Sequence, residues 1–265
     1  MEIEGKVVLV TGGGNGIGRA LCEKFHEAGA KGVGVADLDG GAAAEVAKRI
    51  GGLGLTTDVS EEADIQRAVA ATEERFGPID LMCSNAGVAF SDAPGWMATS
   101  QTNEQWERIW KINVMAHVWG ARAALPGMIR RGRGHLLHTV SAAGLLNQIG
   151  DAAYSTTKHA ALGFVESLAI THGDQGIGVS ALCPQAVQTG LYEGEGTDKI
   201  AAAASQDGVL TPEEVAEFTV EALRQEVFLI LPHESVRTYF TRKAGDYDRW
   251  IRGMRRFRRS VFQGS

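Results

Sequence analysis

The chain has 265 residues, of which 44% are apolar, and a formal net charge of −6 at pH 7. These values fit one α/β domain with a large core and exclude disorder as the default. The three cysteines form no C-x-x-C pair and the seven histidines show no metal-ligand spacing, so we predict a reducing compartment and no metal. Because we find neither a signal peptide nor an apolar run of about 18 residues, we expect a cytoplasmic protein.

Short apolar runs and amphipathic stretches alternate along the chain, as strands and helices do in an α/β fold. We expect strands near residues 7–10, 33–36, 53–57, 79–84, 135–140, 178–183 and 227–231. We expect helices near residues 17–28, 42–50, 61–76, 103–125, 152–172 and 212–225. This alternation predicts a parallel sheet covered by helices on both faces. We place this domain at residues 1–233 and a C-terminal extension at residues 234–265.

A glycine-rich turn links the first expected strand to the first helix. Its candidate cofactor-binding residues are Gly12, Asn15, Gly16, Ile17 and Gly18. Glycine lets a ligand approach the backbone closely, and free N–H groups at the start of a helix attract a pyrophosphate. The turn therefore indicates a dinucleotide site, although a glycine-rich loop by itself is also typical of a plain turn.

The end of the second expected strand supplies an acidic residue. Asp37 follows Gly18 by nineteen residues, close to the ~20 expected for the acid that binds an adenosine ribose. A carboxylate accepts hydrogen bonds from a free 2′-hydroxyl and repels a 2′-phosphate. The glycine turn has Asn15, not a basic residue, so the sequence favours NAD over NADP. The alternative for Asp37 is a helix N-cap.

Three polar residues form a candidate reaction centre. Tyr154 and Lys158 lie four apart in an expected helix and so share one face, and Ser141 follows the fifth expected strand. An ammonium group nearby can lower the phenol pKa from about 10 by roughly 1–3 units, giving an acid–base group near neutral pH. Ser141 could hold the same reacting oxygen. By itself, a Tyr/Lys pair is more often part of a solvated helix face.

Taken together, these motifs resemble those of the short-chain dehydrogenase/reductase family over about residues 5–231. The resemblance implies a doubly wound, seven-stranded α/β sheet, the Rossmann fold, in a single domain. It adds Asn113 to the catalytic set of Ser141, Tyr154 and Lys158. It also extends the cofactor-binding set to Tyr154, Lys158, Asp58, Val59, Asn85, Ala86, Gly87, Pro184, Val187 and Thr189.

Three features depart from the family pattern. Ser84 and Gln185 stand where the family carries asparagine and glycine, and the last strand, 227–231, replaces a glycine-rich segment. The side chain of Gln185 makes contacts beside the nicotinamide less certain, and the last strand puts the usual tetramer contact in doubt. A homodimer through helices 103–125 and 152–172 is the expectation from the resemblance, with a homotetramer as the alternative.

The resemblance implies an oxidoreductase that moves a hydride between NAD(H) and a carbinol carbon. Tyr154 is then the base in oxidation and the acid in reduction, while Ser141 stabilises the reacting oxygen. Lys158 lowers the pKa of Tyr154 and binds the nicotinamide ribose, and Asn113 holds a helix distortion and a proton-relaying water. The alternative is a non-catalytic NAD-binding sensor or scaffold that works through the C-terminal tail.

Two segments are expected to line the substrate site, the loop after Gly87 and residues 190–208. They contribute Phe90, Trp96, Met97, Leu191 and Tyr192. Their apolar groups and low positive charge favour an apolar secondary alcohol or ketone over a phosphorylated substrate. The small residues of 190–208 predict a mobile lid. Asp151 either faces this pocket or caps the following helix.

The last 32 residues differ in charge from the rest of the chain. Residues 234–265 carry nine Lys/Arg and three Asp/Glu, a net charge of +6, whereas residues 1–233 carry −12. Apolar residues recur there at helical spacing, which predicts a basic amphipathic helix weakened by Gly253 at a cost of about 1 kcal/mol. We favour packing on its own acidic domain or on a sister subunit. The alternatives are weak contact with an anionic membrane at its inner face and, less favoured, a nucleic-acid-binding tail.

Overall fold

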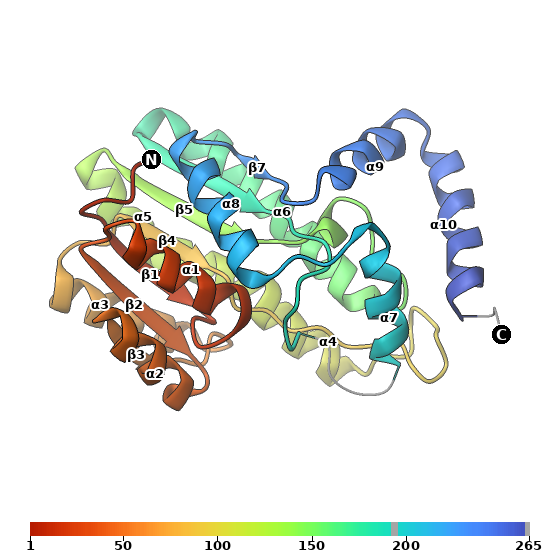
Figure 1. The fold of residues 1–265 in the computed structure, drawn as a ribbon, viewed down its shortest axis with the longest axis horizontal. Coiled ribbons are helices and arrows are strands. Elements are labelled where there is room, and N and C mark those ends of the chain that lie inside the picture. Colours follow the sequence, from red (N-terminus) through yellow and green to blue (C-terminus); the bar gives the residue numbers. More distant parts are fainter. Residues whose placement is uncertain (192–195, 263–265) are drawn as a thin grey trace.

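In the computed structural model, which describes residues 1–191 and 196–262, seven parallel strands form one sheet in the order β3-β2-β1-β4-β5-β6-β7 (Figure 1). The strands are β1 (Val7–Thr11), β2 (Gly32–Asp37), β3 (Leu53–Thr56), β4 (Leu81–Ser84), β5 (Gly134–Thr139), β6 (Ile177–Leu182) and β7 (Leu229–Ile230). The strand order reverses between β1 and β4, which is where an open α/β sheet forms its ligand crevice. The predicted doubly wound fold is confirmed.

Helices cover both faces of the sheet (Figure 1). The α-helices of the described residues are α1 (Gly16–Glu27), α2 (Gly40–Ile50), α3 (Glu62–Phe76), α4 (Asn103–Trp110), α5 (Ala116–Arg131), α6 (Ala152–His172), α7 (Thr197–Ala204), α8 (Pro212–Arg224), α9 (Glu234–Gly245) and α10 (Tyr247–Phe262), of which α7, α9 and α10 lie away from the sheet. Val8 and Leu9 are neighbours in β1 but belong to different buried apolar clusters, because successive side chains of a strand point to opposite faces. The core therefore has two layers, one on each side of the sheet.

The helix expected at 103–125 is divided and longer. A π-helical turn at Lys111–Met115 separates α4 from α5, and α5 continues through Pro126 to Arg131. Residues on both sides of the proline, Ala124 and Met128, are buried in the core. The stabilisation from this packing outweighs the loss of the backbone hydrogen bond that the proline cannot donate.

The segment expected to be a mobile lid contains a short helix. Within 190–208 the structure has α7 and a 3₁₀ turn at Ser205–Asp207. Ile200 of α7 is fully buried, so this segment has the apolar anchor that its small residues did not suggest. Tyr192, which was expected to line the substrate site, lies outside the described residues.

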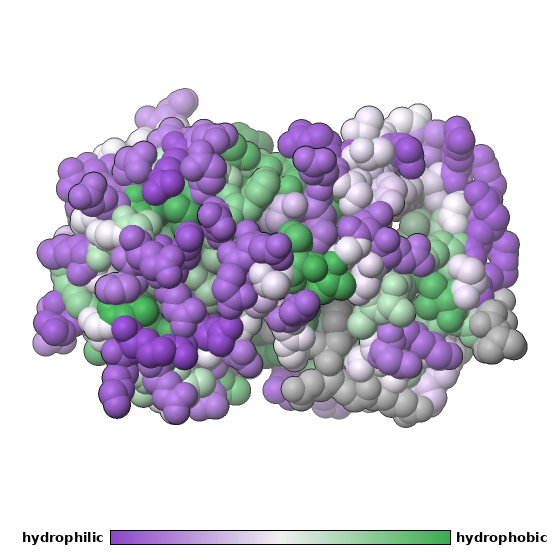
Figure 2. Space-filling model, in the orientation of Figure 1, coloured by the Kyte–Doolittle hydropathy of each residue, from purple (hydrophilic) through white to green (hydrophobic). Residues whose placement is uncertain are grey.

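The C-terminal extension consists of α9 and α10, and it packs on its own domain. Val236 and Lys243 of α9 are buried, whereas α10 has no buried residue and stands at the outer edge of the molecule (Figure 1). Figure 2 shows a hydrophilic band along the outer side of α10. Among the described residues, no helix is long and apolar enough to cross a membrane. We predicted packing on its own domain or on a sister subunit, and the contacts of α9 are with its own domain.

Candidate active site

The glycine-rich turn between β1 and α1 is formed by left-handed backbone and close contacts. Gly12 and Gly16 have φ angles of +63° and +49°, which residues with a side chain rarely adopt. A Cβ atom on Gly18 would lie 1.9 Å from the carbonyl oxygen of Gly12, so only glycine fits there. Asn15 caps α1 by accepting a hydrogen bond from the N–H of Gly16 at 2.8 Å. The start of α1 is thereby held at the carboxyl end of β1, as an anion site requires.

Asn85 joins the ends of three neighbouring strands. Its amide nitrogen donates to the carbonyl oxygen of Thr11 at 3.0 Å, and its amide oxygen accepts from the hydroxyl of Thr139 at 2.9 Å. The N–H of Ala86 donates to the Thr11 hydroxyl at 3.2 Å. These bonds place residues 85–87 against the glycine turn. Thr11 opens the glycine-rich motif, whereas Thr139 carries no motif signal, so the sequence analysis missed the part of Thr139 in the site.

Asp37 lies at the end of β2 and faces the glycine turn. One carboxylate oxygen accepts from the N–H of Gly14 at 2.8 Å, and the other accepts from the N–H of Asp39 at 3.0 Å. It is Asp39, not Asp37, that caps α2, by accepting from the N–H groups of Gly41 and Ala42. The helix N-cap alternative for Asp37 is therefore wrong.

The residues after β3 form the turn into α3. Asp58 accepts from the N–H of Ser60 at 2.9 Å, which shapes the turn into α3. Val59 is buried in a small apolar cluster that also contains Ile112 of the π-helical turn. Both residues follow the carboxyl end of β3, and their assignment to cofactor binding stays a prediction from the family resemblance.

Ser141 and Tyr154 meet at the end of β5. Tyr154 is buried in α6, and the Ser141 hydroxyl makes a hydrogen bond with its phenol. Ser141 also accepts from the N–H of Ala143 at 3.0 Å, which fixes its side chain in the turn after β5. Two hydroxyl groups thus converge on one point above the sheet, an arrangement that can bind and protonate a substrate oxygen.

The charge state of Tyr154 differs from the expectation. Burial raises the pKa of Tyr154 to about 12. The hydrogen bond from Ser141 lowers this pKa, but by less than burial raises it. The Lys158 ammonium nitrogen lies 5.5 Å from the centroid of the phenol ring and donates to the carbonyl oxygen of Thr139 at 3.0 Å. Burial lowers the pKa of Lys158 to about 8. Desolvation of the phenol therefore outweighs the effect that we assigned to Lys158.

Asn113 lies in the π-helical turn and links two parts of the site. Its side-chain nitrogen donates to the carbonyl oxygen of Val88 at 2.9 Å and to the hydroxyl of Thr157 at 3.2 Å. Its side-chain oxygen accepts from the N–H of Val88 at 2.9 Å. Gly87 lies close to Asn113 and Lys158, since a Cβ atom on it would be 3.4 Å from a polar atom of each. Asn113 thus holds the segment after β4 against α6.

Asp151 caps α6 and is fully buried. Its carboxylate accepts from the N–H of Tyr154 at 3.0 Å, from the N–H of Phe90 at 2.9 Å and from the side-chain amide of Gln101 at 3.1 Å. Burial raises the pKa of Asp151 to about 7. The capping alternative is correct, and the same carboxylate also positions the loop that carries Phe90.

The segment after β6 lies between the glycine turn and the reaction centre. The carbonyl oxygen of Pro184 accepts from the N–H of Ala142, and a Cβ atom on Gly16 would lie 3.1 Å from the Thr189 methyl group. Val187 forms a β-bridge with Leu210. Gln185, where the family carries glycine, donates to Asp207 at 3.0 Å and to the carbonyl oxygen of Ala204 at 2.9 Å, so it anchors the turn after α7.

Apolar side chains surround Tyr154. It packs in a cluster with Ala89, Ile109, Ala143, Ala153, Val88, Phe90, Trp106 and Leu191. Phe90 and Leu191 were expected to line the substrate site and do lie in this cluster. Trp96 instead packs on Phe262 of α10 with ring centroids 4.2 Å apart, and Met97 is 60% exposed.

Comparison with known proteins supports the family resemblance that the sequence motifs indicated. A sequence model described as short chain dehydrogenase matches residues 6–199. The 1-deoxy-11-beta-hydroxypentalenate dehydrogenase of Streptomyces exfoliatus is 34% identical over 244 residues, which cover 89% of this chain and 86% of that protein. The 3beta-hydroxysteroid dehydrogenase 2 of Eggerthella lenta is 31% identical over 198 residues, 72% of this chain and 75% of that protein.

A solved structure extends the likeness to nearly the whole fold. The short chain dehydrogenase/reductase from Burkholderia phymatum, in complex with NAD, superposes with a TM-score of 0.84 at 30% identity. The match covers 94% of this chain and 96% of that chain. With the sheet order, the glycine turn and the family match in agreement, the chain belongs to the short-chain dehydrogenase/reductase family of oxidoreductases, which act on CH–OH groups.

Proposed function

We propose that the protein is an NAD-dependent dehydrogenase of apolar secondary alcohols, or a reductase of the matching ketones, with Tyr154 as the general acid–base. The observation that carries this proposal is the buried pair of Ser141 and Tyr154 hydroxyls, joined by a hydrogen bond and flanked by Lys158. A binding protein without a reaction needs no such pair. The geometry therefore favours the enzyme over the sensor or scaffold.

The residues around the glycine turn fit a dinucleotide with a free ribose 2′-hydroxyl. The N–H groups at the start of α1 and the carboxylate of Asp37 lie on one edge of the sheet, and Asp37 already contacts Gly14 of the turn. A 2′-phosphate here would meet the negative charge of Asp37 without a basic residue in the turn to offset it. NAD, when bound, supplies the hydride acceptor for alcohol oxidation. NADP is the less favoured cofactor.

Ser141 and Tyr154 act on the substrate oxygen. Ser141 donates a hydrogen bond that stabilises negative charge on that oxygen. Tyr154 transfers the proton, as base in oxidation and as acid in reduction. Because its pKa is about 12 in the ligand-free protein, Tyr154 is poised as an acid. Oxidation requires that this pKa fall when the site is filled.

Lys158 and Asn113 support Tyr154 in different ways. Lys158 lies one helical turn from Tyr154 and is the cation nearest to the phenol ring among the described contacts, so its charge favours the phenolate and opposes the effect of burial. Asn113 positions both Val88 and Thr157, the neighbour of Lys158. The water that the family resemblance assigns to Asn113 remains a prediction, as does the contact of Lys158 with the nicotinamide ribose.

The substrate class follows from the surroundings of Tyr154 and from the relatives. The apolar cluster of Phe90, Leu191 and their neighbours favours a hydrocarbon skeleton next to the reacting oxygen. Two similar enzymes are named for a hydroxypentalenate and a hydroxysteroid. We also propose a homodimer or homotetramer, since Trp110 of α4 and Ile170 of α6 are large apolar side chains that are 41% and 85% exposed.

The test is the variant Tyr154→Phe, assayed with NAD and an alcohol selected by screening the wild type. Loss of the acid–base group should lower kcat by roughly 10²–10⁴-fold while the variant still binds NADH. Tyr247→Phe, which removes a hydroxyl from an exposed tyrosine of α10, is the matched control and should keep full activity. Turnover that survives in Tyr154→Phe would show that the proposed mechanism is wrong.

A further inference from the structure

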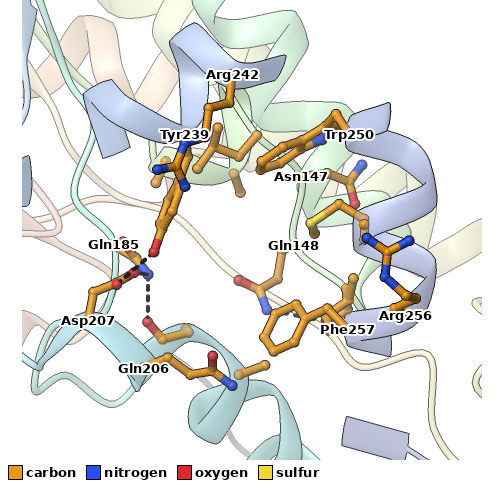
Figure 3. Close-up of a pocket in the computed structure, with 18 of the residues that line it drawn as sticks. Asn147, Gln148, Gln185, Gln206, Asp207, Tyr239, Arg242, Trp250, Arg256 and Phe257 are labelled. Atoms are coloured by element: carbon orange, nitrogen blue, oxygen red, sulfur yellow. Dashed lines mark hydrogen bonds between the residues drawn. The ribbon is translucent and has the colours of Figure 1, made fainter. Parts of the chain in front are cut away.

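A cavity of about 890 Å³ lies between the loop that follows Ser141 and the two C-terminal helices (Figure 3). One wall is formed by α9 and α10, and the opposite wall by the 3₁₀ turn after α7. Figure 3 shows Phe257 of α10 and Gln148 of the loop pointing into the space between these walls. The volume is in the range of sites for small organic ligands, roughly 300–1,000 Å³.

The cavity adjoins the segment that follows Ser141, although Ser141 and Tyr154 do not themselves line it. Ala142 and Ala143, which directly follow Ser141, line it, and Ala143 also packs in the apolar cluster that contains Tyr154. Gln185, which directly follows Pro184, lines it from the other side. A substrate with its oxygen at Ser141 therefore has the cavity next to it, and the cavity is the space available for the rest of that substrate.

Part of the cavity wall is apolar, between polar side chains such as Asn147, Gln148 and Gln206. Leu146 and Ile149 come from the loop after Ser141, and Trp250, Met254 and Phe257 come from one face of α10. These α10 residues are spaced by three and four positions, so they form a single stripe turned toward the domain. The stripe that the sequence predicted as a packing or membrane surface thus forms a wall of this cavity.

The cavity is lined by arginine side chains that are free to pair with an anionic ligand. Three arginines line it, Arg242 on α9 and Arg249 and Arg256 on α10, and among the described residues none of them has an ion pair within 4 Å. The two acidic residues that line the cavity already accept hydrogen bonds from other groups of the protein. Asp207 accepts from Tyr239 and Gln185, and Asp246 accepts from the N–H of Arg249 at the start of α10.

The wall is held in place by a buried lysine. The Lys243 ammonium of α9 donates to the carbonyl oxygens of Leu145 at 2.6 Å and Leu146 at 3.3 Å, in the loop after Ser141 that also lines the cavity. At its other end, α10 is fixed by the stacking of Phe262 on Trp96. The arginines are therefore carried by a supported wall and not by a loose tail.

We propose that the C-terminal helices select a substrate that carries a carboxylate remote from its alcohol or ketone, with an apolar skeleton between the two groups. The skeleton lies along Leu146, Trp250 and Phe257, and the carboxylate is bound by the arginines of α9 and α10. Guanidinium groups suit this role because they pair with carboxylates through two parallel hydrogen bonds. This inference rests on the proposed function only in taking the occupant of the cavity to be the substrate.

The test compares two probes of equal chain length, decanoate and 1-decanol, by their effect on tryptophan fluorescence. We expect decanoate to bind the wild type at least about tenfold more tightly, since about 1.4 kcal/mol from a charged pair gives that factor. In the double variant Arg249→Gln/Arg256→Gln, this preference should fall to about twofold or less, while decanol binding changes little.

The matched control is Arg252→Gln/Arg259→Gln, which removes the same charge from α10 at the same spacing but from residues that do not line the cavity. It should keep the preference for decanoate. Equal binding of the two probes to the wild type, no binding of either, or an equal loss in both double variants would overturn the proposal. NADH affinity, measured on the same proteins, separates this result from the proposed function, because it reports the dinucleotide site without using the cavity.

Discussion

The dinucleotide side and the cavity side of Tyr154 are constructed in different ways. The dinucleotide side consists of main-chain groups and short side chains at the ends of buried strands, such as Gly12, Asp37 and Asn85. The cavity side consists of long side chains on helices from the end of the chain, and Lys243 contacts a residue 98 positions before it.

This difference indicates on which side of Tyr154 residues can be substituted without disturbing the fold. On the dinucleotide side, a single added methyl group collides with the backbone, because the contacts there involve main-chain atoms. On the cavity side, half-buried or exposed side chains determine which ligand fits, and they can be replaced without disturbing the sheet. We therefore expect mutations to have large effects on cofactor binding at the first side, and smaller, substrate-dependent effects at the second.

The largest effect is expected for Gly18→Ala. The new Cβ atom would lie 1.9 Å from the carbonyl oxygen of Gly12, so the turn must open and the affinity for NADH should fall by at least about 100-fold. Gly163→Ala in α6 is the control, because a Cβ atom there meets nothing within 4 Å. It should leave NADH binding intact and raise the free energy of unfolding by about 0.5–1 kcal/mol. Normal NADH binding by Gly18→Ala would contradict the contrast between the two sides.

A second effect concerns Tyr154, which lies where the two sides meet. Since burial raises its pKa to about 12, the ligand-free protein should show no ionisation of this phenol below about pH 11. The protonated, acidic form is thus present throughout the neutral range and is lost only as the pH rises through that pKa. The measurement is the tyrosinate absorbance of wild type minus that of Tyr154→Phe. A difference that titrates near pH 7 to 8 in the free protein would show that Lys158 outweighs burial.

A smaller effect is expected for Lys243→Met on the cavity side. The variant keeps the length of the side chain but leaves the buried carbonyl oxygens of Leu145 and Leu146 without the ammonium, at a cost of about 1–3 kcal/mol in the free energy of unfolding. Decanoate should bind more weakly, whereas NADH should bind as before. Arg237→Met, at another position of the same helix, is the control and should change stability by less than about 0.5 kcal/mol. If NADH binding also fell, the two sides would not be separable.

The sequence predicted the dinucleotide side more completely because its residues are close to one another along each strand–turn–helix unit. Gly12, Asp37 and Asn85 each directly follow a strand or end one, and parallel strands bring those positions to one edge. The same argument placed Ser141 at this edge, and the spacing of four residues placed Tyr154 and Lys158 on one face of a helix. What it missed is physical detail that depends on the assembled fold, such as the burial that raises the pKa of Tyr154.

The cavity side was predicted less well because its contacts join distant parts of the chain. The apolar stripe of α10 was visible as a pattern, but its partner was not, and the buried role of Lys243 has no local signal at all. Trp96 was assigned to the substrate site from its position after Gly87, whereas it packs on Phe262. Such pairings follow from tertiary packing, which the spacing of one chain does not contain.

The central claim, an NAD site at the ends of β1 and β2, is tested most directly by a titration of NADH against NADPH on wild type and Asp37→Ala. Energy transfer from the five tryptophans to the bound nicotinamide reports binding. We predict tight NADH binding by the wild type, with NADPH gaining affinity only in the variant, because the repulsion between Asp37 and a 2′-phosphate is then removed. Equal or tighter NADPH binding by the wild type would contradict the role of Asp37, and no binding of either would contradict the dinucleotide site itself.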